Sequence, residues 1–419
     1  MKKFVRAVLP AFLLAISVGQ IYAFTNFSDE IARHIGEAQK SVQFAFSLGI
    51  FFLGMGAAFF GKIVEKNLRL STVVGTLLFV SGLVVTALGI SAKSLPLVYL
   101  GYGFLVGTGT GIIYIAPVKT MMLWFPDSKA IAAAIPIVSF GLGSTLSTLL
   151  YRGIGGADSV LPVHLVGLRD AFQVAENSAG IVGVFYSLAA FYVLPMAAAV
   201  FLLARPKASP GASSAAAQPE FSYAQLLKDS FFLRAWLFMF LNICAGLSLI
   251  PLAKQMMKVP SVGYAEGVIT TVIALAGVMN GGGRLIFAWW SDRLRQRTNI
   301  LLFILAISFG IMTMSIWPPM IGLAILVINA CYGAGFSVIP AILADNYGLA
   351  NLSKVLGAVL SAWGFAGLVG NQTAMFVAKT FGGYGEGGHG YVAVVVMLIA
   401  VYALNFANAW TLKRSLARS

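Results

Sequence analysis

Uncharged apolar runs of about twenty residues recur along the whole chain, and "VAVVVMLIAVYALNFANAW" (392–410) is one of them. A helix of about this length crosses the ~30 Å hydrocarbon core of a bilayer. Charged residues make up 10% of the sequence, whereas soluble globular proteins carry roughly 25%. Membrane β-barrels instead show alternating segments of ~10 residues. The sequence therefore predicts an all-α membrane protein.

Twelve windows of this kind divide into two groups of six, which indicates two six-helix bundles. The predicted spans are 5–24, 41–61, 70–91, 95–117, 130–151, 181–203, 233–253, 267–290, 299–317, 319–341, 355–378 and 390–411. Residues 204–230 are rich in Pro, Ala and Ser and predict a flexible linker. We expect an N-terminal bundle over 1–203, a cytoplasmic linker over 204–230 and a C-terminal bundle over 231–419.

The first apolar run has an alternative interpretation as a secretory signal peptide, because it has a basic start and ends in small residues. It is long for a signal, and the polar residues Gln20 and Tyr22 lie inside it. These features favour a first membrane helix.

Basic residues are distributed unequally between the two sets of loops. With both termini in the cytoplasm, 19 of the 28 Lys and Arg residues lie on the cytoplasmic side and eight on the outer side, while Arg284 lies within a span. This asymmetry follows the positive-inside rule. The net charge of +14 is scattered over short gaps between apolar runs. We therefore expect a bacterial inner-membrane protein surrounded by lipid, with no nucleic-acid partner.

A weak internal repeat supports the two bundles. "GKIVEKNLR" begins at Gly61 after the second span, and "AWWSDRLRQR" begins at Ala288 after the eighth. The pair Asp292-Arg293 follows the pair Glu65-Lys66 by 227 residues. Each pair places an acid beside a base in a short turn between two helices.

This repeat resembles the G-x-x-x-D-R-x-G-R loop of the major facilitator superfamily. Leu68 and Arg295 stand where the second glycine is usual, and Ala288 replaces the first glycine of the second copy. The resemblance implies a twelve-helix major facilitator fold in which the acid of each loop contacts a neighbouring helix end and helps to hold the outward-open state. The implied conformational residues are Gly61, Glu65, Lys66, Arg69, Asp292 and Arg293. The alternative is a pair of solvated turns that obey the positive-inside rule.

Arg284 lies in an apolar segment, eight residues before Asp292. Eight residues span ~12 Å of helix, which puts Arg284 near the bilayer midplane. A charge there costs at least ~2.5–3.5 kcal/mol on insertion scales, so such residues usually face a cavity or a partner. No Asp or Glu lies in the interior of a predicted span. The pattern favours bidentate binding of a carboxylate over a structural ion pair.

Several stretches resemble the oxalate/formate antiporter family within the superfamily: "GQIYAFTNF", "GIIYIAPVKTMMLWFPD" and "IPAILADNYGLANLSKVLG". The resemblance implies that a small carboxylate is enclosed by an aromatic cage and the arginine of the eighth span. The matching positions are Tyr22, Tyr114, Tyr332, Phe336 and Arg284. Gln20 and Asn280 are further polar candidates inside the spans, where interhelical hydrogen bonding is the more ordinary role.

Trp363 stands where the oxalate transporters carry a lysine that faces the arginine. A dicarboxylate would lose its second countercharge there, so the resemblance implies a monocarboxylate such as pyruvate, lactate or formate. The indole could pack against a short methyl group.

Glycines at four-residue spacing occur on two spans, as Gly103, Gly107 and Gly111 and as Gly277 and Gly281. Small residues at this spacing allow helices to approach closely. Both sets predict helix packing, and the alternative is a hinge for a rocking movement.

Together these features predict a monomeric secondary transporter of small carboxylates that uses no cofactor or metal and exchanges anions by alternating access. Proton-coupled monocarboxylate symport is the main alternative. A drug or sugar exporter and a membrane carboxylate sensor are weaker ones. No phosphate-binding loop, metal-ligand cluster or nucleophile–base pair in the sequence suggests an enzyme.

Overall fold

The computed structural model describes residues 1–155, 166–206, 220–250, 252–385 and 389–416. Every regular element within these ranges is helical. The chain folds into two compact units. Unit 1 comprises Met1–Pro126, Ile135–Ala217 and Leu352–Gly364, and unit 2 comprises Asp127–Ala134, Gln218–Asn351 and Phe365–Ser419. The predicted bundle boundaries stay a prediction, and the units differ from them in the short segments 127–134 and 352–364.

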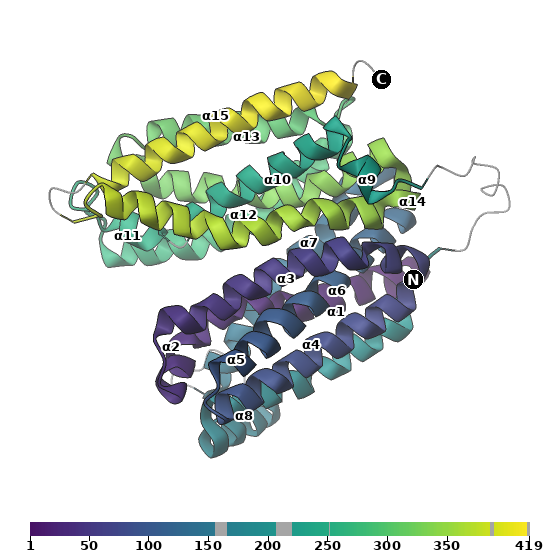
Figure 1. Cartoon of the computed structure of the whole chain (residues 1–419), viewed down its shortest axis with the longest axis vertical. Coiled ribbons are helices and arrows are strands. Elements are labelled where there is room, and N and C mark those ends of the chain that lie inside the picture. Colours follow the sequence, from purple (N-terminus) through teal and green to yellow (C-terminus); the bar gives the residue numbers. More distant parts are fainter. Residues whose placement is uncertain (156–165, 207–219, 251, 386–388, 417–419) are drawn as a thin grey trace. The chain divides into compact units, whose positions relative to one another are not determined.

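The six spans predicted in the first half lie on helical segments (Figure 1). The first span and its extension are built from η1 (Phe4–Val8), α1 (Leu9–Val18), the 3₁₀ turn η2 (Gly19–Ala23) and α2 (Phe24–Ile35). The others correspond to α3 (Gln39–Lys66), α4 (Leu68–Ser91), the series α5 (Leu95–Val98), η3 (Tyr99–Val106) and α6 (Gly107–Trp124), then α7 (Lys129–Gly155) and α8 (Val166–Leu202).

The six spans predicted in the second half also lie on helices. These are α10 (Ser230–Leu249), α12 (Glu266–Arg293), α13 (Asn299–Met314), α14 (Ile321–Thr380) and α15 (Gly390–Leu416). The short helix α9 (Tyr223–Leu226) precedes α10, and the short helix α11 (Ala253–Met257) lies between α10 and α12. The seventh span ends at Leu249 rather than at 253. Part of the predicted linker is helical, because Ser222 and Gln225 form a capping box that starts α9.

α14 carries two of the predicted spans, 319–341 and 355–378, on one helical run. The run is interrupted at Gly348, whose φ of 75° and ψ of 159° are not helical. This conformation favours glycine, because a Cβ atom would clash with the backbone there. The connection between the two spans is therefore a break at one residue and not a loop.

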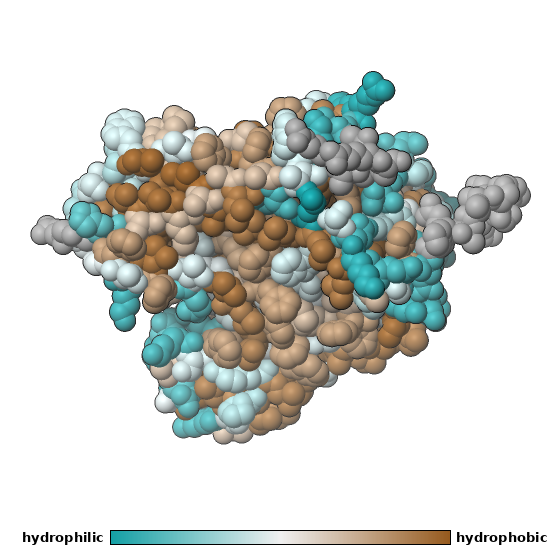
Figure 2. Space-filling view, turned by 45° about the horizontal axis from the view of Figure 1, so that its top comes forward, coloured by the Kyte–Doolittle hydropathy of each residue, from teal (hydrophilic) through white to brown (hydrophobic). Residues whose placement is uncertain are grey.

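Nine described helical segments are long and apolar enough to cross a bilayer, and α14 is the main part of the longest of them. α13 is a shorter apolar helix, and the side chains of α7 are described only in part. Figure 2 shows apolar residues over much of the face in view, with hydrophilic residues gathered mainly towards its edges. The surface is that of a multi-span membrane protein.

Glycines set the closest helix approaches in both units. In unit 1, a Cβ atom on Gly107 would lie 2.5 Å from the carbonyl oxygen of Gly49, and one on Gly111 would lie 2.1 Å from that of Leu53. α6 therefore packs directly on the backbone of α3, as the spacing of these glycines predicts.

The prediction for the second glycine set is wrong. A Cβ atom on Gly277 or Gly281 meets no described heavy atom within 4 Å. The close contact of α12 is made instead by Gly283, where a Cβ atom would lie 2.3 Å from the carbonyl oxygen of Ala330 on α14. Four-residue spacing shows that one helix face is smooth, but it does not show that another helix lies against it.

We predict that Gly111→Ala destabilises the protein by about 1–3 kcal/mol, because the added methyl group forces α3 and α6 apart. Gly281→Ala is the matched control. It adds the same methyl group in open space and removes a residue of low helix propensity, so stability should hold or rise by up to about 1 kcal/mol. Thermal unfolding of the two purified variants in detergent measures the difference. Equal shifts would contradict the packing at Gly111.

Candidate functional site

The buried cation predicted from the sequence lies in unit 2, on α12. The side chain of Arg284 is 7% exposed. Its Nε donates a hydrogen bond to Oδ1 of Asn280, one helical turn earlier, at 3.1 Å. Asn280 thus holds one edge of the guanidinium and fixes the direction of its plane.

α14 supplies further contacts of Arg284. Cζ of the arginine lies 5.7 Å from the ring centroid of Phe336, which is a cation–π distance. Tyr332 lies beside Phe336, with ring centroids 5.3 Å apart. A Cβ atom on Gly333 would lie 3.1 Å from Cγ of Arg284, so the glycine leaves room for the arginine stem. Arg284, Asn280, Tyr332 and Phe336 form one group, which we name the arginine cluster.

A second group lies within unit 1 and is aromatic. Trp363 is 2% exposed. Its ring centroid lies 6.3 Å from that of Tyr22, 5.6 Å from that of Tyr114 and 5.7 Å from that of Phe140. Phe140 also contacts both tyrosines edge-on. We name Tyr22, Tyr114, Phe140 and Trp363 the aromatic cluster. It presents flat apolar surface bordered by two phenol groups and an indole.

Gln20 is the predicted site residue that belongs to neither cluster. It is fully buried, and its amide lies against the hydroxyl of Tyr102 at 3.3 Å. The structure thus turns Gln20 towards the interior of unit 1, on another side of the η2 turn from Tyr22. Its role as a substrate contact stays a prediction. Among the described residues, no three His, Cys, Asp or Glu side chains converge as metal ligands.

The first conformational loop lies in unit 1, at the end of α3. The Glu65 carboxylate accepts a hydrogen bond from the backbone amide of Ser353 at 3.2 Å and forms an ion pair with the buried Lys119 of α6. Gly61 allows this approach, because a Cβ atom there would lie 2.5 Å from the carbonyl oxygen of Ser353. The loop therefore ties the segment 352–364 to α3, and the role of Glu65 in the outward-open state stays a prediction.

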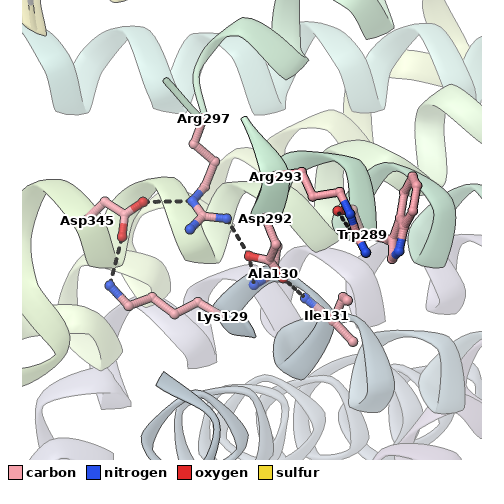
Figure 3. Close-up of polar contacts among 8 residues, drawn as sticks. All are labelled: Lys129, Ala130, Ile131, Trp289, Asp292, Arg293, Arg297 and Asp345. Carbon is pink, nitrogen blue, oxygen red and sulfur yellow. Dashed lines mark hydrogen bonds and ion pairs between the residues drawn. The ribbon is translucent and has the colours of Figure 1, made fainter. Parts of the chain in front are cut away.

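The second loop lies in unit 2, at the end of α12, and is drawn in Figure 3. The Asp292 carboxylate accepts hydrogen bonds from the backbone amides of Ala130 and Ile131, both at 3.0 Å. These amides belong to the first turn of α7, where helical N–H groups have no partner within the helix. A carboxylate there also interacts favourably with the helix dipole. Asp292 is thus the cap of α7.

Two further charges extend this contact. Arg297 forms ion pairs with Asp292 and with Asp345, the latter at 2.7 Å. Nζ of Lys129 lies 2.8 Å from Oδ1 of Asp345, the carboxylate oxygen that Arg297 does not contact (Figure 3). Burial acts to lower the pKa of Arg297, but hydrogen bonds and charge from Asp345 and Asp292 outweigh it and raise that pKa. The alternating cations and anions form one connected network at the start of α7.

The other predicted loop residues lie outside these networks. Arg293 stacks on Trp289, with Cζ 3.7 Å from the ring centroid, and donates to the Trp289 carbonyl. Arg69 lies over the ring of Phe201 at 5.3 Å, and Lys66 is exposed at the end of α3. These basic residues cover apolar surface with their stems while the charge stays near water.

Several residues of the clusters and networks could not be picked out from the sequence. Phe140 is one of 31 phenylalanines and carries no local signal that separates it from the others. Asp345 stands out only as part of a stretch with a family resemblance, and Lys119, Lys129 and Arg297 only as loop charges. The repeat itself offered a signal, because "SK" occurs at Ser128-Lys129 and again at Ser353-Lys354. The loop acids accept hydrogen bonds from backbone amides at or next to these two positions.

The sequence is similar to known membrane transporters. A family model described as Major Facilitator Superfamily matches residues 8–371. The chain is 25% identical over 389 residues to the oxalate:formate antiporter of Oxalobacter formigenes, covering 90% of this chain and 85% of that protein. It is 24% identical over 361 residues to the uncharacterized MFS-type transporter YhjX of Escherichia coli (strain K12), covering 84% and 83%. Apicoplast pyruvate carrier 1 of Toxoplasma gondii is 25% identical over 331 residues, covering 67% and 59%.

Solved structures are similar in fold over almost the whole chain. The fucose:proton symporter FucP of E. coli superposes with a TM-score of 0.67 at 16% identity, covering 97% of this chain and 99% of that one. The human organic anion transporter MFSD10 superposes with a TM-score of 0.66 at 14% identity, with the same coverage. At these identities the likeness concerns the fold alone.

We predict that Asp292→Ala lowers the free energy of unfolding by about 3 kcal/mol, because it leaves two helix amides without their acceptor and Arg297 with Asp345 as its remaining ion-pair partner. Arg293→Ala changes the adjacent residue and removes an exposed cation–π contact and an exposed hydrogen bond to the Trp289 carbonyl, which together are worth about 1 kcal/mol. Thermal unfolding of both variants in detergent measures the contrast. A loss for Arg293→Ala as large as that for Asp292→Ala would contradict the role of Asp292 as the cap of α7.

Proposed function

Because the chain belongs to the Major Facilitator Superfamily, we propose that it is a secondary transporter of small carboxylates that works by alternating access. Membership of this family and the apolar helices make it an integral, multi-pass membrane protein of a transporter family. We further propose that it acts as a monomer in a bacterial inner membrane, with both termini in the cytoplasm.

The geometry of Arg284 carries the proposal of a carboxylate. The guanidinium is buried, and its plane is fixed by Asn280 and Phe336. A planar guanidinium matches the two oxygens of a carboxylate in a bidentate pair, which a lysine cannot do. Burial lowers the local dielectric and strengthens such a pair. Two of the relatives are named for small carboxylates, oxalate and formate in one and pyruvate in the other.

The aromatic cluster supports a monocarboxylate over oxalate. Tyr22, Tyr114 and Trp363 offer apolar ring faces, against which the methyl group of pyruvate or lactate packs well. A second carboxylate on this surface would be desolvated, and the aromatic residues carry no cation to compensate for it. We therefore propose the arginine cluster of unit 2 as the carboxylate contact and the aromatic cluster of unit 1 as an apolar contact that favours a monocarboxylate.

The two loop acids support the alternating-access part of the proposal. Glu65 and Asp292 each accept backbone N–H groups from a segment that is separated along the chain from the rest of its unit. Making these contacts stabilises the conformation in which they form over one in which they are broken. We propose that Gly61, Glu65, Lys66 and Arg69 in one loop, with Asp292 and Arg293 in the other, hold the outward-open state.

We propose exchange over one-way transport, because one relative is named an oxalate:formate antiporter. In exchange, an anion occupies the binding site on the outward step and on the return step. The buried guanidinium of Arg284 is the contact proposed for the carboxylate in both steps. The alternative to anion exchange is symport of a monocarboxylate with a proton. Uptake driven by a proton gradient alone would favour it.

We predict that the protein in proteoliposomes takes up labelled pyruvate, lactate or formate rapidly when the vesicles contain unlabelled carboxylate. Arg284→Ala should abolish this uptake. Arg284→Lys keeps the charge but loses the bidentate geometry, so uptake should fall roughly ten- to a hundredfold, the loss expected for one charge-assisted hydrogen bond. Arg33→Ala is the control for removal of an exposed arginine that lies outside the cluster and both loops, and it should transport normally.

Three results would count against this function. Near-normal uptake by Arg284→Ala removes Arg284 from the binding site. Specific binding of a carboxylate without any flux indicates a sensor. Rapid uptake into empty vesicles under a proton gradient alone replaces exchange by proton symport.

We predict that Trp363→Lys raises the ratio of oxalate to pyruvate uptake by at least about tenfold, because a second cation then meets the second carboxylate. Trp363→Phe keeps an aromatic ring and should retain the monocarboxylate preference. Competition of unlabelled oxalate and pyruvate against labelled substrate measures the ratio. A folded lysine variant with an unchanged ratio would show that Trp363 does not select the substrate.

A further inference from the structure

The first membrane helix changes its pitch beside the aromatic cluster. Between α1 and α2 the five residues Gly19–Ala23 form a 3₁₀ turn. Such a turn inside a long helix has poorer hydrogen-bond geometry and often marks a hinge or a strained sequence. Tyr22 of the aromatic cluster is part of this turn. The pitch of the turn therefore sets the direction of a candidate substrate contact.

Three successive side chains of the turn point in three directions. Gln20 contacts Tyr102, and Ile21 lies over Gly49 of α3, where a Cβ atom would be 3.4 Å from Cδ1 of Ile21. Tyr22 points into the aromatic cluster. A 3₁₀ helix rotates by about 120° per residue and an α-helix by about 100°. Relaxation to α-helix would turn Tyr22 by about 40° relative to Gln20.

The hydroxyl of Tyr102 lies against the carbonyl groups of this turn. It donates to the carbonyl oxygen of Ile21 at 2.9 Å, and the carbonyl and side-chain oxygens of Gln20 lie at 3.4 and 3.3 Å. A phenol has one proton to donate, so the Ile21 carbonyl is the favoured acceptor. In a membrane-spanning helix, water is not available to a carbonyl whose helical hydrogen bond is weakened. The phenol supplies a protein donor to the Ile21 carbonyl.

Tyr102 is itself held firmly. It is fully buried on the π-helix η3, and its ring is tilted against that of Phe24 with centroids 4.1 Å apart. A Cβ atom on the adjacent Gly101 would lie 2.5 Å from the backbone nitrogen of Thr86, so η3 packs directly on α4. π-helical turns occur frequently at functional sites. The turn is closely packed too, because a Cβ atom on Gly19 would lie 2.0 Å from the carbonyl oxygen of Phe140. The hydrogen bond therefore joins two packed segments, and its hydroxyl comes from η3.

We propose that Tyr102 is a positioning residue that holds the 3₁₀ pitch of Gly19–Ala23 through its hydrogen bond to Ile21 and so keeps the Tyr22 ring in the aromatic cluster. Tyr102 sets substrate affinity without touching the substrate. This inference rests on the proposed function for the role of Tyr22. The simpler alternative is that Tyr102 is an ordinary buried tyrosine whose loss lowers stability and nothing else.

Tyr102→Phe tests the inference, because it removes only the hydroxyl. Tyr99→Phe is the matched control. Tyr99 lies on the same π-helix and donates from its hydroxyl to another backbone carbonyl, that of Ser41, at 2.7 Å. Two quantities are measured on each variant. One is amide hydrogen exchange in peptides that cover residues 19–25, which reports local opening without any ligand. The other is the KM and maximal rate of carboxylate uptake.

We expect faster exchange over 19–25 in Tyr102→Phe and a KM raised about two- to tenfold, the range for loss of one neutral hydrogen bond. The maximal rate and the unfolding temperature should change little. Tyr99→Phe should leave both the local exchange and KM unchanged. In a Tyr22→Leu background, Tyr102→Phe should have no further effect on KM, because Tyr102 acts through Tyr22.

The proposal is overturned by unchanged exchange over 19–25 in Tyr102→Phe. It is also overturned if exchange rises while KM stays the same, or if the full effect on KM persists in the Tyr22→Leu background. Equal effects of Tyr99→Phe would assign the result to the π-helix in general. If the wild-type protein transports no carboxylate, the proposed function and the role of Tyr102 in substrate affinity are both wrong. The comparison of amide hydrogen exchange still decides whether Tyr102 holds the turn.

Discussion

A bilayer cannot hydrogen-bond the backbone, so a place inside the membrane where this chain leaves regular α-helix needs a donor or acceptor from the protein itself. In the loops, acidic side chains bind backbone groups in a similar way. The Asp292 carboxylate accepts from two amides at the start of α7, and the Glu65 carboxylate accepts from an amide at Ser353. The Tyr102 hydroxyl supplies a donor to the 3₁₀ turn of the first span. Each of these three polar side chains therefore forms a hydrogen bond with the backbone.

The same constraint explains which charges are buried. Asp292 and Glu65 are each paired with a cation, Arg297 and Lys119, which offsets the cost of removing a carboxylate from water. Arg284 is also buried, and it contacts an amide oxygen and an aromatic ring. Both contacts orient the guanidinium. A buried and oriented guanidinium is the property that a carboxylate site requires, and it is why the proposed function rests on this residue.

Sequence patterns predicted the helices well, because an apolar run of fixed length has one stable structure in a bilayer. They were less informative wherever a neighbouring helix decides the outcome. Glycine spacing was right for α6 and wrong for Gly277 and Gly281, since spacing does not reveal which face meets a partner. The 3₁₀ turn at Gly19–Ala23 and the single-residue break at Gly348 interrupt no apolar pattern, so hydropathy could not detect them. The loop acids were found through the repeat, whereas their partners Lys119, Arg297 and Asp345 come from other parts of the chain.

The arrangement of the two units along the chain limits where movement can occur. Each cluster lies wholly within one unit, the arginine cluster in unit 2 and the aromatic cluster in unit 1. Each cluster therefore depends on contacts within its own unit. The chain passes between units within α7, near residue 135, and within α14, near residues 352 and 365. Pro136 follows the first of these points and removes a helical hydrogen bond there. Gly364 stands just before the last of them. Sharp kinks in helices occur mainly at proline and at glycine or serine pairs, whereas the contacts of Asp292 and Glu65 hold the adjoining segments to their own units. Under the proposed alternating access, bending is therefore expected at Pro136 and Gly364 and not inside either cluster.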